Sequence, residues 1–173
     1  MAKVYSFMKR GKNMLTAIKE SVSITNVSSV ANAFLSYEPM THKKLQKLCY
    51  YAYAWHLTLY KKPLFDEKFE AWIHGPVARP LYSEYKEYGW NPIPSSEFPS
   101  ELYSEPTAVE IVKMVFNAYG HLDGDELEYL THTEAPWLEA REGLEPDEIS
   151  NRELNDKTIV DYYYKIFEKG QND

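Results

Sequence analysis

The segment from Thr41 to Leu59 constrains the fold more than any other part of the chain. Side chains suited to burial recur there at spacings of three and four, which is the repeat of one face of an α-helix. The members of this stripe are Leu45, Leu48, Cys49, Ala52, Trp55, His56 and Leu59. Apolar residues also cover the other sides. The segment therefore predicts a central helix with neighbours nearly all round, from which Lys43, Lys44 and Lys47 emerge at one end.

The remaining pattern predicts further, shorter helices. N-cap residues are expected at Ser28 or Ser29, Thr41, Thr107 and Asp123, because Ser, Thr and Asp side chains can accept hydrogen bonds from the free N–H groups of a first turn. The expected helices, apart from the central one, cover residues 28–35, 77–89, 109–119, 126–131, 136–138 and 156–169. Proline at position 136 suits the first turn of its helix.

One stretch departs from the helical repeat. Residues 65–74 alternate loosely between apolar and polar side chains and then reach Gly75-Pro76, where glycine suits a turn with positive φ. The predicted fold is thus all-α, with six or seven helices around a central helix and a short β-hairpin or extended segment near residues 65–77. Residues 91–106 contain four prolines and are expected to form a surface loop.

Length and charge indicate one domain with an unusual N-terminus. A chain of 173 residues with 44% apolar side chains can bury a single core. The first twenty residues carry five basic side chains and one acidic one, although the net charge of the whole chain is −7. We therefore expect a basic arm over residues 1–26, either with little fixed structure or folded onto the acidic body, and a single helical domain over residues 27–170.

Several function classes are disfavoured by what the sequence lacks. It has no apolar run long enough for a membrane span and no signal-peptide pattern, and Cys49 is its only cysteine. These features predict a cytoplasmic protein without disulfides. Lys43, Lys44 and Lys47 near a helix N-terminus raise the question of a DNA-reading helix, but that helix is too apolar to lie in a groove, and an acidic body repels nucleic acid.

Catalytic patterns are also missing. The five histidines show no zinc-ligand spacing, and the chain has neither a GxSxG nucleophile motif nor a glycine-rich phosphate loop. We expect no metal, no cofactor and no enzymatic activity. A hydrolase formed by tertiary convergence of His74, His132 and Glu134 stays open as an alternative. The 15 tyrosines and four tryptophans favour protein binding instead, because these residues are enriched at interfaces.

Three ordered motifs carry a family resemblance. They are KLQKLCYYA at residues 44–52, FEAWIHGPV at residues 69–77 and LTHTEAPW at residues 130–137, with PLF at residues 63–65 and YKEYG at residues 85–89 between them. In this order they resemble the Panacea domain, a family also called SocA-like or phage-associated GepA-like. The resemblance covers roughly residues 27–164.

The resemblance implies a mostly helical antitoxin of a toxin–antitoxin system, which neutralises a cognate protein toxin by direct contact. The alternative it implies is a proteolytic adaptor that presents its target to a protease, or a phage-encoded host-interaction protein. Partner contacts are expected at Lys44, Lys47, Tyr50, Trp72, His74, Tyr82, His132 and Trp137. Gly75, Pro76 and Val77 are expected to be structural, and Trp72 and Trp137 are equally suited to holding the fold.

Overall fold

The structure is a computed structural model that describes residues 23–172, so the expected arm lies outside it except for its last four residues. The described chain is mainly helical, as the sequence predicts. Its α-helices are α2 (Val27–Leu35), α3 (His42–Tyr60), α4 (Arg79–Tyr85), α5 (Pro106–Tyr119), α6 (Gly124–His132), α7 (Ala135–Ala140) and α8 (Asp156–Asn172), and its strands are β1 (Phe69–Trp72) and β2 (Gly75–Ala78). Among residues 23–172, no helix is long and apolar enough to cross a membrane.

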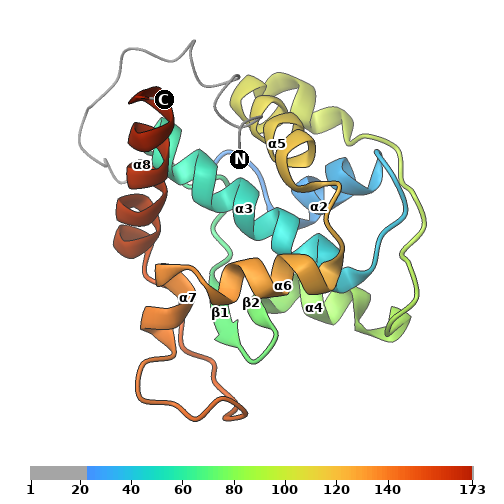
Figure 1. Cartoon of the computed structure of the whole chain (residues 1–173). Coiled ribbons are helices and arrows are strands. Elements are labelled where there is room, and N and C mark those ends of the chain that lie inside the picture. Colours follow the sequence, from blue (N-terminus) through green and yellow to red (C-terminus); the bar gives the residue numbers. More distant parts are fainter. Residues whose placement is uncertain (1–22, 173) are drawn as a thin grey trace.

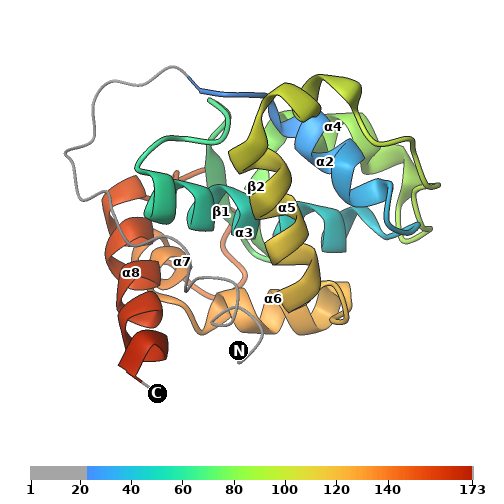
Figure 2. The same ribbon diagram turned by 90° about the horizontal axis from the view of Figure 1, so that it is seen from above.

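Helix α3 is the centre of the molecule, which confirms the prediction. It runs between α5, α6 and α8 and contacts all three, as well as α2 and the hairpin (Figure 1, Figure 2). Every residue from Leu45 to Thr58 is buried, because neighbours surround the helix on all sides. The expectation that Lys47 emerges at one end is wrong. Its side chain is only 1% exposed.

Two of the expected N-caps are confirmed. The Thr41 hydroxyl accepts a hydrogen bond from the backbone N–H of Lys44 at 3.3 Å and starts α3. Asp123 starts α6 and forms a capping box with Glu126, in which each side chain accepts from the other residue's backbone N–H. Both signals are local, so the sequence was sufficient to locate them.

Two other expected N-caps are wrong. Helix α2 is capped by Asn26 rather than by Ser28 or Ser29, because the Asn26 amide oxygen accepts from the backbone of Ser29 at 2.9 Å. Helix α5 begins at Pro106, whose fixed φ suits a first turn. Thr107 therefore lies inside the helix, and its hydroxyl is bonded to a side chain of α3.

The expected hairpin is present. Strands β1 and β2 are antiparallel, with Phe69 opposite Ala78 and Trp72 opposite Gly75. Val77 belongs to β2, not to a helix, because its backbone pairs with β1. The helix expected over residues 77–89 is therefore shorter: α4 ends at Tyr85, and a 3₁₀ turn, η1 (Lys86–Tyr88), follows it.

Both connections that cross the surface are tied to the core. The loop over residues 91–105 contains η2 (Ser100–Ser104), and Ile93 forms an isolated bridge with Met40. After α7 the chain returns along β1, where the N–H of Ala71 bonds to the carbonyl of Arg152 at 2.8 Å. Strand β1 consequently has a neighbour at each edge. Helix α8 then continues past Gly170, where the sequence predicted its end.

Candidate functional site

The hairpin is locked onto α3 by two polar side chains of the KLQKL motif. Gln46 donates to the carbonyl of Ala78 at 3.1 Å and accepts from its N–H at 2.9 Å. Lys47 donates from Nζ to the carbonyl of Pro76 at 3.2 Å. Together they satisfy backbone groups along the free edge of β2, which would otherwise be buried without partners. The sequence did not predict this role, because the burial of Lys47 depends on the elements packed around α3.

Residues near α7 hold β1 from the other side. The Trp137 indole N–H donates to the carbonyl of Trp72 at 2.9 Å, and the Arg141 guanidinium donates to the carbonyl of Ala71 at 3.0 Å. The ring of His132 stacks on Trp137 with centroids 3.9 Å apart. The three sequence motifs therefore meet at one structural unit, the hairpin.

Glycine is favoured at position 75 of the hairpin for two physical reasons. Its φ of +95° lies in a region that side-chain-bearing residues rarely adopt. A Cβ atom placed there would also lie 2.5 Å from Cε of Lys47 and 2.8 Å from Oγ1 of Thr131. Glycine at the turn and lysine on α3 are thus linked through space, although 28 positions separate them in the chain.

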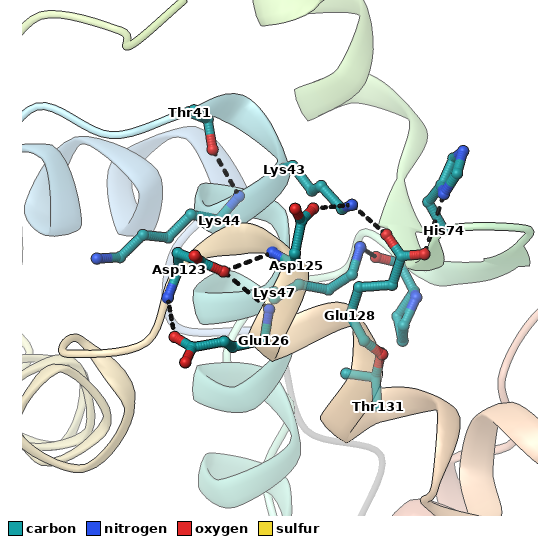
Figure 3. A network of polar contacts seen from close by, with 11 residues as sticks. Thr41, Lys43, Lys44, Lys47, His74, Asp123, Asp125, Glu126, Glu128 and Thr131 are labelled. Atoms are coloured by element: carbon teal, nitrogen blue, oxygen red, sulfur yellow. Dashed lines mark hydrogen bonds and ion pairs between the residues drawn. The ribbon is translucent and has the colours of Figure 1, made fainter. Parts of the chain in front are cut away.

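A polar cluster lies between α3, the hairpin turn and α6 (Figure 3). Lys43 forms an ion pair with Asp125 at 2.6 Å and a second one with Glu128. His74 Nδ1 lies 3.0 Å from the other carboxylate oxygen of Glu128. Lys47 lies beneath this cluster, and burial lowers its pKa from 10.5 to about 7. Glu128 is the group that links the hairpin turn to α6.

The outer face of the hairpin combines aromatic and charged side chains. Arg79 pairs with Glu70 through two hydrogen bonds of 3.0 and 2.7 Å, and its guanidinium lies 5.7 Å from the ring centroid of Trp72. The Trp72 indole donates to the same carboxylate at 2.7 Å and meets the ring of Tyr82 edge-on. The side chain of His74 is 66% exposed at the turn. We call Trp72, His74, Arg79 and Tyr82 the hairpin face.

The predicted contact residues lie in different parts of the structure. Trp72, His74 and Tyr82 lie on the hairpin face, with His132 and Trp137 supporting it. Tyr50 is only 1% exposed and belongs to the core. Lys44 lies elsewhere, bound to Glu38 and to the carbonyl of Gly120, each at 2.7 Å. The sequence did not single out Glu70 and Arg79, because their pairing depends on the hairpin register.

A second buried network joins α3 to α8. Glu134 is 3% exposed and accepts hydrogen bonds from Tyr163 at 2.6 Å and from Tyr51 at 3.2 Å. Burial raises its pKa from 4.5 to about 7, although both tyrosine hydroxyls favour the ionised form. Through Glu134, which precedes α7, this network connects the buried hydroxyls of α3 and α8.

The residues of the alternative hydrolase hypothesis have separate partners. His74 contacts Glu128, His132 stacks on Trp137, and both oxygens of Glu134 accept from tyrosines. Within the described part of the chain, no group of three or more His, Cys, Asp or Glu side chains is placed to hold a metal ion.

Comparison with known proteins gives one finding that bears on function. The family model described as antitoxin SocA-like, Panacea domain, matches residues 45–138, which is more than half of the chain. This span runs from the second turn of α3 to α7 and includes the whole hairpin. Searches of curated proteins and of solved structures found no match.

Proposed function

Because the chain belongs to the family of SocA-like antitoxins with a Panacea domain, we propose that it neutralises a co-encoded protein toxin by direct contact. The family match over residues 45–138 is the observation that carries this proposal. No covalent bond is made or broken in such a mechanism. The toxin is silenced when the bound antitoxin covers its active site or holds it in an inactive conformation. We place this encounter in the cytoplasm.

We propose the hairpin face as the toxin-binding surface. Trp, Tyr and Arg are the residue types most enriched among side chains that dominate binding energy, and the hairpin face contains all three. Trp72 and Arg79 are already held by Glu70, and Trp72 also contacts Tyr82, so little conformational freedom of these side chains is lost when a partner binds. Glu70 completes this arrangement by bonding both Trp72 and Arg79.

The other predicted contact residues receive different roles in this proposal. Lys47 and Tyr50 are each 1% exposed, so they stabilise the platform from inside and do not touch the toxin. His132 and Trp137 support β1. Lys44 is engaged by the α2–α3 connection and the end of α5, so we leave it outside the surface.

Co-expression with the product of the neighbouring gene tests the proposal. The wild-type chain is expected to restore growth and to co-purify with that product as a stable complex. Arg79→Ala is expected to weaken the complex by about 10-fold or more, because it removes an exposed anchor. Lys113→Ala, which truncates an exposed basic side chain on α5, is the matched control and should bind like the wild type. Absence of both rescue and complex would refute the antitoxin assignment.

A further inference from the structure

The loop between α7 and α8 contains an isoleucine that is exposed to solvent. Ile149 is 89% exposed, more than any other large apolar side chain among residues 23–172. Full burial of such a side chain is worth about 1.5–3 kcal/mol, so its exposure in the free protein leaves that stabilisation unused. Single exposed apolar residues are common on protein surfaces. The surroundings of Ile149 are what set it apart.

The loop is fixed on both sides of Ile149. Arg141 is only 6% exposed and donates to the carbonyls of Ala71, Glu145 and Glu148 at 2.9–3.0 Å. On the other side, Ser150 is 8% exposed, and its hydroxyl accepts from the backbone of the loop at 3.1 Å. An apolar side chain presented by an ordered backbone loses little conformational entropy on binding.

The charge around Ile149 specifies the chemistry of a partner. Residues 142–153, which we call the acidic loop, contain five exposed carboxylates and one exposed guanidinium. The carboxylates belong to Glu142, Glu145, Asp147, Glu148 and Glu153. None of them forms an ion pair with another residue in the described range. Unneutralised charge of one sign attracts a surface of the opposite sign and repels nucleic acid and anionic lipid.

The acidic loop adjoins the hairpin. Its last residues run beside β1, where Glu153 forms an isolated β-bridge with Glu70 and the carbonyl of Arg152 accepts from the N–H of Ala71 at 2.8 Å (Figure 1). The loop also lies beyond the family-matched residues 45–138. It is therefore a feature of this chain outside the matched core, placed next to the surface that we assign to the toxin.

We infer that Ile149 and the carboxylates around it form a second contact with the toxin, whose matching surface is an apolar pocket bordered by Lys and Arg side chains. This inference rests on the proposed function and adds the chemistry of the partner. Ile149 enters the pocket, and the acidic loop pairs with the basic border. The charges mainly raise the association rate and select the partner, while the buried isoleucine slows dissociation.

Binding of the full-length chain to the purified product of the neighbouring gene tests this contact. Ile149→Ser is expected to weaken binding by about 10- to 100-fold. Tyr103→Ser, at an exposed aromatic residue of η2, is the matched control and should bind like the wild type. Thermal unfolding of both variants should match the wild type, because neither side chain is buried. Equal affinity of Ile149→Ser and the wild type would overturn the inference and leave the antitoxin assignment intact.

A second variant tests the charge component. Replacing Glu145, Asp147 and Glu148 together by their amides should lower the association rate and flatten its dependence on salt between about 50 and 300 mM. An unchanged association rate with an unchanged salt dependence would overturn the predicted basic border. If the wild-type chain itself fails to bind the neighbouring product, the antitoxin assignment falls, and this inference falls with it.

Discussion

Replacing Gly75 with alanine is expected to destabilise the fold by about 2–6 kcal/mol through two separable effects. The first is backbone strain at φ +95°, which costs about 1–3 kcal/mol for a residue with a Cβ atom. The second is overlap, because the new Cβ would lie 2.5 Å from Cε of Lys47. Overpacking of a filled core costs about 1–3 kcal/mol.

A second glycine with positive φ allows the backbone strain to be measured without the overlap. Gly143 has a φ of +78°, and a Cβ atom added there would meet nothing within 4 Å. Gly143→Ala should therefore destabilise the fold only through backbone strain, by about 1–3 kcal/mol. The difference between Gly75→Ala and Gly143→Ala measures the overlap. Urea denaturation followed by circular dichroism gives both free energies of unfolding.

A double-mutant cycle identifies the colliding partner. In a Lys47→Ala background the Cε and Nζ atoms are gone, so Gly75→Ala should cost about 1–2 kcal/mol less than in the wild type. Loss of the Lys47 hydrogen bond to Pro76 affects both arms of the cycle and cancels. Equal costs in the two backgrounds, or a Gly75→Ala cost no larger than that of Gly143→Ala, would refute the proposed coupling between turn and helix.

Three further substitutions each test a different contact of the fold. Burial raises the pKa of Glu134 from 4.5 to about 7, so ionisation of this carboxyl group lowers the free energy of unfolding as pH rises from 4.5 to 7. Glu134→Gln lacks this ionisation. Its free energy of unfolding should therefore rise by about 3 kcal/mol relative to that of the wild type between pH 4 and pH 8. A pH-independent difference in denaturation free energy would contradict this. Arg141→Met should lower the free energy of unfolding by about 2–4 kcal/mol, because three loop carbonyls lose their donor. It should also speed amide hydrogen exchange in residues 142–153. Unchanged exchange would show that other contacts hold the loop. Asp123→Ala should cost about 1 kcal/mol in thermal unfolding, because α6 loses its N-cap, and an unchanged melting temperature would argue against that cap.

The elements that the sequence located well are those with local signals. The apolar repeat after Thr41 defines α3 without knowledge of its neighbours, and Asp123 with Glu126 marks the start of α6. The predicted N-caps of α2 and α5 are wrong because several polar residues near the start of each helix are suited to capping it. Only backbone geometry decides which of them faces a free N–H group, as it does for Asn26.

The surface that we propose for toxin binding was only partly predictable, because it depends on the register of the hairpin. Trp72, His74 and Tyr82 were expected from the motifs, whereas Arg79 joins them only because β2 places it beside β1 and Glu70. Ile149 carried no sequence signal, since an isolated isoleucine in a polar segment can equally be buried. Its exposure is evident only in the tertiary structure, where Arg141 bonds to the neighbouring carbonyl of Glu148.

The sequence by itself determined a mainly helical domain around one buried helix, the glycine turn of the hairpin and the family to which the ordered motifs belong. The tertiary structure alone decided that Lys47 is buried, that it reaches the hairpin, and that Glu134 is enclosed by tyrosines. The physical reason is the same in each case. A buried polar group needs a partner, and here the partners lie 29 to 83 positions away, beyond the reach of any local pattern.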